Sequence, residues 1–276
     1  MNTTSAPATL YLERPGGRIA FDISGPESGH LVVCLPGMGD LRSTYRHLRV
    51  GLTAAGCRVA VMDLRGHGDS DASFEAYDDE AAAADAIALI EALGGSGVVV
   101  GSSMGAGAAV VAAQARPDLV NGLVLIGPFV RNVPMPAIMR WAFRLAMGGP
   151  WSTRVWLSYL PTLYPSRRGE EFEEHRRDIA AAMRRPGRAA AFRRTTRTDH
   201  APAWRAAQRV SAPTFILMGS EDPDFGDPAG EAELIARTVG GTAVMIPGAG
   251  HYPQMEFPDV TTPAIVDFVT ETMHHA

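Results

Sequence analysis

Short apolar runs alternate with longer amphipathic stretches along most of the chain. The runs are rich in Val, Leu and Ile and are bounded by Gly, Pro or charged residues, a pattern typical of buried strands. We expect strands at residues 10–13, 18–24, 31–35, 58–62, 97–100, 123–126, 215–218 and 243–246. The stretches between them predict helices at residues 45–55, 79–93, 103–116, 229–239 and 262–272. This alternation predicts an α/β fold with a doubly wound, mostly parallel, eight-stranded sheet.

The alternation stops after the sixth predicted strand. Residues 127–211 show no strand pattern, and helical patterns occur at 138–147, 153–160, 172–183 and 188–194. We therefore expect a helical cap at residues 128–211, inserted between two parts of one core domain, 1–127 and 212–276. Such a cap would lie over the carboxyl ends of the strands, where open α/β sheets bind ligands. Most of the large apolar side chains of residues 135–164 are expected to pack the cap against the core, and a minority to line a pocket.

The charged residues exclude some functions and leave others open. The chain has 276 residues and a net charge of −5, and all 25 basic residues are arginine. Without lysine, neither a Schiff base nor a P-loop is available. Residues 131–209 hold 16 Arg against 6 Asp and Glu. Because these arginines recur at helical spacing, we interpret them as a solvated helix face rather than a nucleic-acid surface, and an attraction for anionic substrates stays open.

Targeting signals and metal spacings are not visible. There is no apolar run of about 18 residues, so no membrane span is expected, and residues 1–8 are polar without a secretory pattern. We accordingly expect a cytoplasmic protein. Cys34 and Cys57 lie in or beside predicted strands and are expected to be buried free thiols. No Cys/His or His/Asp cluster has metal spacing, so neither a metal nor a cofactor is expected.

Residues 101–105 spell the pattern G-x-S-x-G around Ser103. Val98, Val99 and Val100 precede it, and an alanine-rich helical stretch follows, which is the strand, turn and helix context of a nucleophile elbow. In that turn the serine adopts a strained backbone conformation, and the helix amides after it point toward any oxyanion formed beside it. The pattern alone arises by chance in glycine-rich chains, so its meaning depends on partners elsewhere in the sequence.

Four further segments, each soon after a predicted strand, carry candidate functional residues. They are Pro36-Gly37-Met38-Gly39, Asp63-Leu64-Arg65-Gly66-His67-Gly68-Asp69-Ser70, Gly219-Ser220-Glu221-Asp222-Pro223 and Gly248-Ala249-Gly250-His251. Together with the elbow they resemble the α/β-hydrolase fold family, in its capped, esterase-like serine hydrolases. The resemblance covers almost the whole chain, and the order Ser, Asp, His is that of α/β-hydrolases. One departure is Pro36, where family members usually have histidine.

The resemblance implies a role for each segment. Ser103 would be the nucleophile and His251 its base, while Asp222 would orient the histidine; Glu221, Asp224 and Asp227 are alternatives for the acid. The backbone N–H groups of Met38 and Met104 would form the oxyanion hole. The segment at 63–70 would be structural, so His67 is interpreted as a brace rather than a base.

The expected activity is hydrolysis of a small or medium, largely apolar carboxylic ester through an acyl-enzyme. Serine at the elbow argues against the related dehalogenases and epoxide hydrolases, which use aspartate there. Alternatives with the same triad are a C–C bond hydrolase, a lactonase or a cofactor-free perhydrolase. A hydrolase-like ligand receptor with slow turnover is a further alternative. The expected partner is a small-molecule substrate, with no nucleic acid, and the oligomeric state stays open.

Overall fold

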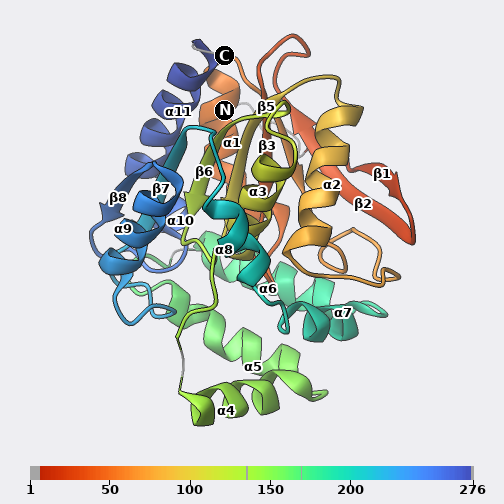
Figure 1. Ribbon diagram of the computed structural model, residues 1–276. Coiled ribbons are helices and arrows are strands. Elements are labelled where there is room, and N and C mark those ends of the chain that lie inside the picture. Colours follow the sequence, from red (N-terminus) through yellow and green to blue (C-terminus); the bar gives the residue numbers. More distant parts are fainter. Residues whose placement is uncertain (1–6, 135, 169, 275–276) are drawn as a thin grey trace.

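The core of the protein is one twisted sheet of eight strands (Figure 1). The computed structural model describes residues 7–134, 136–168 and 170–274, so most of the polar N-terminal segment lies outside the described residues. The strands are β1 (Leu10–Arg14), β2 (Gly17–Ser24), β3 (Leu31–Leu35), β4 (Arg58–Met62), β5 (Gly97–Ser102), β6 (Val120–Ile126), β7 (Thr214–Gly219) and β8 (Thr242–Ile246). Their order in the sheet is β1-β2-β4-β3-β5-β6-β7-β8. Only β1 and β2 run antiparallel to their neighbours, which confirms the predicted mostly parallel sheet.

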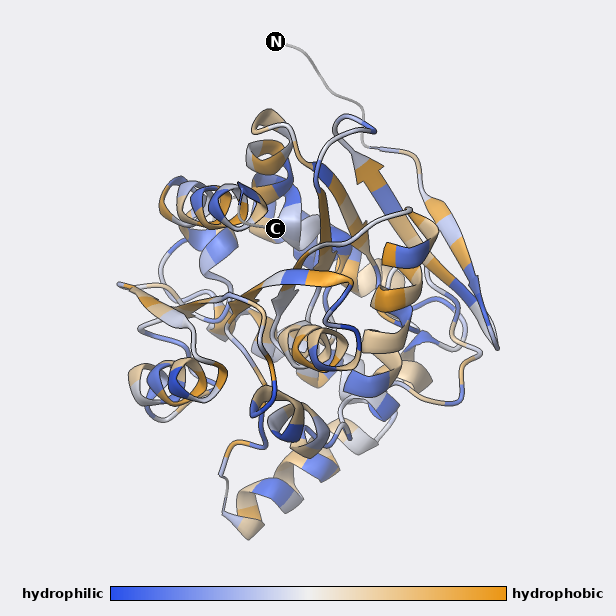
Figure 2. Cartoon of the chain, turned by 45° about the horizontal axis from the view of Figure 1, so that its top comes forward, coloured by the Kyte–Doolittle hydropathy of each residue, from blue (hydrophilic) through white to orange (hydrophobic). Residues whose placement is uncertain are grey.

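Helices cover both faces of the sheet because successive strand side chains point to opposite sides. Val32 and Cys34 pack in one buried cluster with α1 (Arg46–Ala54) and α11 (Pro258–His274). Val33 and Leu35 pack on the other side with the remaining core helices. These are α2 (Asp79–Ala92), α3 (Met104–Ala115), α8 (Ala201–Ala207) and α9 (Pro228–Val239). In Figure 2 the helices around the sheet alternate hydrophilic and hydrophobic colours along their length, as expected for helices with one face on a core.

The regular elements described between β6 and β7 are all helices, joined by loops, and none is a strand. They include α4 (Ala137–Gly148), α5 (Ser152–Tyr159), α6 (Glu170–Met183) and α7 (Arg188–Thr195) before α8. Figure 1 shows α4 to α7 beyond one end of the sheet. A separate apolar cluster, including Trp156, Leu163, Tyr164 and Phe192, holds part of this insertion together. By contrast, α8 packs against α3 in the core layer.

The expectation that large apolar side chains of the insertion mostly pack against the core is wrong for α4. Along this helix only Met147 is buried, whereas Ile138 is 70% exposed and Trp141 is 62% exposed. The helix projects from the rest of the molecule in Figure 1 and makes most of its contacts with α5. Amphipathic spacing shows that a helix has an apolar face, but not what covers it.

Most predicted elements are present with small shifts at their ends. The sequence did not predict α8, nor α10 (Pro253–Glu256) beside the last strand, and the 3₁₀ turns η1 (Arg42–Tyr45) and η2 (Leu160–Leu163) were also missed. Cys34 and Cys57 are buried and free, as expected. Among the described helices, none has the length and apolar character needed to cross a membrane.

Candidate active site

Ser103 sits in a strained turn between β5 and α3. Its backbone has φ 56° and ψ −122°, and among the described residues it is the one non-glycine with positive φ. The neighbouring glycines are required, because a Cβ at Gly101 would collide with the backbone of Gly105, and a Cβ at Gly105 with that of Leu35. Backbone strain of this kind persists only where surrounding contacts enforce it, and it clusters at functional sites. The structure therefore contains the elbow that the sequence predicted.

Backbone contacts hold the elbow against the end of β6. The Ser103 N–H donates to the Ile126 carbonyl at 2.8 Å, and the Phe129 N–H donates to the Ser103 carbonyl at 3.2 Å. The Phe129 ring in turn lies 5.7 Å from the His251 ring, edge to face. Ser103 and His251 thus share a neighbour at the carboxyl edge of the sheet.

His251 and Asp222 form a buried pair at that edge. His251 Nδ1 lies 2.7 Å from Asp222 Oδ2, and both residues are almost completely buried. The approach depends on Gly127, where a Cβ would lie 3.1 Å from His251 Nδ1. The His251 N–H also donates to the Leu163 carbonyl at 2.9 Å, which ties this loop to the insertion. A neutral His251 that donates its Nδ1–H to Asp222 keeps the Nε2 lone pair free to accept a proton.

No hydrogen bond joins Ser103 Oγ to His251 among the described residues. Such bonds between nucleophile and base are often long before substrate binds and shorten in the reacting complex. The structure therefore brings the histidine and the acid together and places the serine at the same edge.

The alternative acids named from the sequence lie elsewhere or play a different part. Asp227 caps α9 by accepting the Gly230 N–H at 3.0 Å, and Glu221 is exposed. Asp224 lies nearer, with Oδ2 at 3.7 Å from His251 Nδ1. Its other oxygen accepts the Tyr159 hydroxyl of α5. Asp224 is therefore a second carboxylate behind the imidazole, held by a residue that no sequence motif marked.

Asp222, Asp224 and His251 also form the one group in the described residues whose ligand atoms could hold a metal ion. One atom from each lies within 4.8 Å of the others. Sequence spacing did not predict this group, because two of its members come from the loop after β7 and one from the loop after β8. The Nδ1 proton that bonds Asp222 would have to leave before Nδ1 could bind a metal. The 2.7 Å contact fits a histidine–carboxylate pair directly.

Two carboxylates raise the basicity of His251. Burial alone would lower the pKa of this histidine, but the charges of Asp222 and Asp224 outweigh burial. The result is a pKa raised from 6.5 to about 9. A base in this position becomes a stronger proton acceptor, at the cost of staying protonated to higher pH.

The loop after β3 carries Met38, half-buried, beside Ser103. A Cβ at Gly37 would lie 3.3 Å from Ser103 Oγ, so glycine permits this close approach. The Gly39 N–H donates to His67 Nε2 at 2.9 Å, and His67 Nδ1 donates to the Arg65 carbonyl at 2.9 Å. Burial lowers the pKa of His67, which favours the neutral form that this arrangement requires. His67 therefore braces the loop that follows Pro36.

A second brace comes from the insertion and was not predicted. Trp156 Nε1 of α5 donates to the Gly39 carbonyl at 3.1 Å, so both the N–H and the carbonyl of Gly39 are bonded. The two partners are 117 residues apart in the chain, and no local pattern marks the contact. Met104, whose amide was the other expected oxyanion donor, is buried at the first position of α3.

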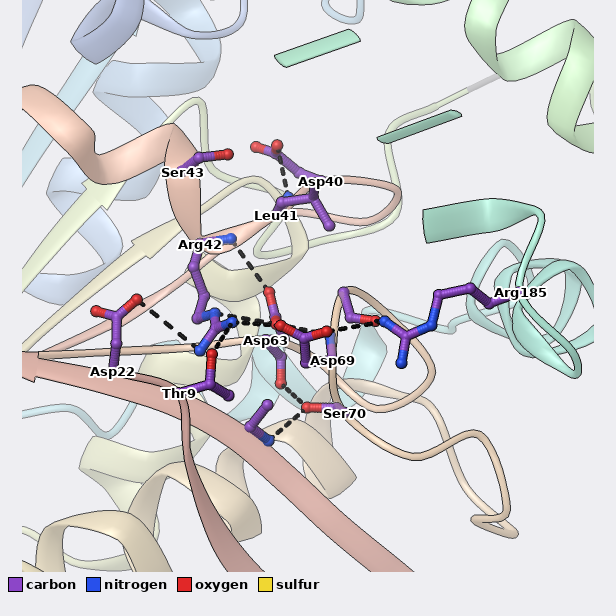
Figure 3. Close-up of polar contacts among 12 residues, drawn as sticks. Thr9, Asp22, Asp40, Leu41, Arg42, Ser43, Asp63, Asp69, Ser70 and Arg185 are labelled. Atoms are coloured by element: carbon purple, nitrogen blue, oxygen red, sulfur yellow. Dashed lines mark hydrogen bonds and ion pairs between the residues drawn. The ribbon is translucent and has the colours of Figure 1, made fainter. Parts of the chain in front are cut away.

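The segment at 63–70 is tied into a buried ionic network, shown in Figure 3. Asp63 contacts Arg42 Nε at 3.1 Å and accepts the Asp69 N–H at 3.0 Å. Arg42 also bonds Asp69 at 2.7 Å, and Ser70 Oγ donates to the Asp63 carbonyl at 2.9 Å. Burial raises the pKa of Asp63 to about 6, although Arg42 opposes the shift. These contacts fix the loop that carries His67.

The chain is similar to known hydrolases in sequence and in fold. The sequence profile of the alpha/beta hydrolase family matches residues 32–264. A 2-(acetamidomethylene)succinate hydrolase from Mesorhizobium japonicum is 28% identical over 265 residues, covering 92% of each chain. The structure of a thermophilic esterase from Thermogutta terrifontis, with malate bound, is 28% identical with a TM-score of 0.77 and covers 97% of this chain and 99% of its own.

A more distant structure shows the same fold. An esterase from Exiguobacterium antarcticum superposes with a TM-score of 0.80 at 20% identity, covering 93% of this chain and 97% of its own. The family profile spans most of the sheet and both loops that carry His251 and Asp222. The chain therefore belongs to the alpha/beta hydrolase family, and its activity is that of a hydrolase in this family.

Proposed function

We propose that the protein is a serine carboxylesterase that acts on small or medium esters through an acyl-enzyme. The observation that carries the proposal is the buried 2.7 Å pair of His251 and Asp222 at the sheet edge where the strained elbow holds Ser103. An unactivated serine is a poor nucleophile, so it needs a base that a third group orients. Ser103, His251 and Asp222 supply these three roles.

In the first half of the reaction, Ser103 Oγ attacks the ester carbonyl carbon and His251 Nε2 takes the hydroxyl proton. The carbonyl oxygen becomes an oxyanion and accepts hydrogen bonds from the amides of Met38 and Met104. Asp222 stabilises the imidazolium and keeps its orientation. The carbon–oxygen bond to the alcohol then breaks, and His251 returns the proton to the departing alkoxide.

Water completes the cycle by equivalent steps, in which water is the nucleophile and Ser103 is the leaving group. His251 accepts a proton from water, the hydroxide attacks the acyl carbon, and the oxyanion occupies the same two amides. Collapse releases the carboxylic acid, and the proton returns to Ser103. No cofactor is required for these steps.

We further propose that residues 128–211 act as a cap that shapes the site, with α8 at its end packed on the core. Three contacts support this role. Trp156 bonds Gly39, Tyr159 bonds Asp224, and His175 Nε2 lies 2.7 Å from Asp40 Oδ1. Each joins the cap to a loop at the carboxyl edge of the sheet. The apolar rings of Trp156 and Phe192, 5.7 Å apart over Gly39, favour an apolar part of the substrate.

The relatives extend the range of substrates to be tested. One is named as a hydrolase of a substituted succinate, and the esterase structure contains malate. Both names contain dicarboxylates, so esters that carry a free carboxylate belong in the test beside apolar ones.

The activity test is a series of p-nitrophenyl esters of graded acyl length, from acetate to decanoate. We expect kcat/KM to peak at short to medium chains, because the cap closes over the loop after β3 with bulky rings. Release of p-nitrophenol measures the rate, and lactone and β-diketone substrates are run in parallel. Turnover of those substrates alone, with no ester hydrolysed, would overturn the esterase assignment.

The raised pKa of His251 predicts the pH dependence. His251 must be neutral to take the Ser103 proton. The value of kcat/KM for a neutral ester should therefore rise with pH along a limb whose midpoint lies above 6.5, toward about 9. Asp222→Asn should move this limb to lower pH, because it removes the largest favourable charge. Initial rates between pH 5 and 10 measure the limb, and a midpoint below 6 in the wild type would contradict the account.

The same shift affects stability with a definite sign. Since the folded pKa is raised, protonated His251 stabilises the fold fully below its unfolded pKa, and this contribution is lost as pH rises from 6.5 to about 9. Between pH 6.5 and about 9, the melting temperature of the wild type should therefore fall more than that of Asp222→Asn.

A further inference from the structure

Arg188 is a buried cation with no partner among the described residues. It is the first residue of α7 and is 7% exposed. Its Nε atom is buried without a hydrogen-bond partner, and within the described residues its guanidinium makes no hydrogen bond or ion pair. Arg185, three residues earlier, differs: it is half-exposed and bonds the Gly68 carbonyl and Asp69, each at 2.8 Å.

Arg188 lines a small cavity between the cap and the core. The walls are two cap helices, α6 and α7, and the loops after β3 and β4; they include Gly39, Asp40, His67, Met183 and Phe192. The cavity is lined in part by Gly39, which directly follows Met38, whose amide is the proposed oxyanion donor. It is therefore placed to receive a part of the substrate beyond the reacting carbonyl.

Three acids whose charges act on Arg188 are paired with other arginines. Asp63 bonds Arg42, Asp69 bonds Arg42 and Arg185, and Asp71 bonds Arg18. Asp40 also lines the cavity: its Oδ1 is bonded by His175 and by the Leu41 N–H, whereas its Oδ2 is buried without a hydrogen-bond partner among the described residues. Burial lowers the pKa of Arg188, but a guanidinium stays protonated in proteins. A buried charge without a partner destabilises the fold, so its presence here calls for a ligand that supplies the opposite charge.

We propose that Arg188 binds a carboxylate of the substrate, remote from the ester that Ser103 attacks. This inference rests on the proposed function, since it assigns a substrate class to the same site. A planar guanidinium can donate two parallel hydrogen bonds to a carboxylate, and such pairs are strongest where water is excluded. The preferred substrate is then a monoester of a dicarboxylic acid, with the apolar chain lying past Gly39 under Trp156 and Phe192.

Paired esters test the proposal in the whole enzyme. The acidic ester is p-nitrophenyl hydrogen adipate, and the neutral ester is its methyl ester. Arg188→Gln should lower kcat/KM for the acidic ester about 30-fold, the value expected for a lost charged hydrogen bond, and change the neutral ester less than about threefold. Arg185→Gln, the matched control at an exposed and paired arginine, should leave both within about twofold. An equal loss for both esters, or no loss for either, would overturn the proposal.

A binding measurement separates this proposal from the esterase assignment. Calorimetry with adipate should show one site in the wild type, weakened at least about tenfold in Arg188→Gln and unchanged in Arg185→Gln. Adipate should compete with the neutral ester, and adipamide should bind neither variant nor wild type. If adipate binds through Arg188 while neither ester turns over, the esterase proposal fails and the carboxylate site stands. Binding that does not compete with ester, or that is insensitive to Arg188, overturns the site.

Folding controls keep the test decisive. Because the guanidinium has no partner to lose within the described part of the chain, Arg188→Met should keep or raise the melting temperature. A large fall in melting temperature for both Arg188→Met and Arg188→Gln would show a structural role and contradict the assignment.

Discussion

Replacing Ser103 by alanine is expected to lower kcat for a p-nitrophenyl ester by about a millionfold, to the rate left by the oxyanion amides alone. The change removes the atom that forms the acyl-enzyme, and no neighbouring group can replace it. The melting temperature should fall little, because alanine keeps the Cβ atom and the substitution removes only one hydroxyl group. Stopped-flow and long-time absorbance assays cover the required range of rates.

The matched control for this variant is Ser102→Ala. Ser102 ends β5, is completely buried, and its hydroxyl has no hydrogen-bond partner among the described residues. Removing this hydroxyl should leave kcat within about threefold of the wild type, since no other group among the described residues loses a hydrogen bond. If the two variants lose activity equally, the effect comes from disturbing the turn and not from loss of a nucleophile.

Asp222→Asn is expected to lower kcat by about 10⁴-fold, while Asp224→Asn lowers it less than about tenfold. An amide at 222 can donate to Nδ1, which would favour the tautomer that presents a proton, rather than a lone pair, to Ser103. Asp222 Oδ2 lies at 2.7 Å from Nδ1, whereas Asp224 Oδ2 lies at 3.7 Å and its other oxygen accepts from Tyr159. Rates with one ester, measured for both variants at the same pH, decide between the carboxylates.

The double variant adds a check on this assignment. If Asp224 compensates in part for the loss of Asp222, changing both should cost more than the product of the single effects. A larger loss in Asp224→Asn than in Asp222→Asn would show that the sequence selected the wrong acid.

The sheet and the elbow were predictable because their determinants are local. Buried parallel strands are short apolar runs, and the turn around Ser103 needs glycine at fixed positions where backbones meet. The histidine loop was recognisable for the same reason, since it follows the last strand directly. Among the acids, the sequence could only rank Asp222 above its neighbours, because which one meets Nδ1 depends on the path of the loop after β7.

Contacts made across the cap could not be predicted in this way. Trp156 meets Gly39 and His175 meets Asp40 over separations of more than 100 residues, and the cap carries no turn motif that fixes its position. The apolar face of α4 predicted a helix but not its exposure, and α8 was missed because seven residues give little periodicity. The arginine excess suggested an anionic substrate, but only the structure singles out Arg188, since most other arginines of the cap are exposed or paired.

Covalent labelling with a fluorophosphonate tests the central claim most directly, because the reagent reacts with an activated serine and needs no knowledge of the substrate. The wild type should gain one adduct, mapped by mass spectrometry to the peptide that contains Ser103. Ser103→Ala should gain none, and His251→Ala should react at least about 10³-fold more slowly, because the serine loses its base. An adduct on another residue, or undiminished labelling of Ser103→Ala, would contradict the assignment of Ser103 as the nucleophile.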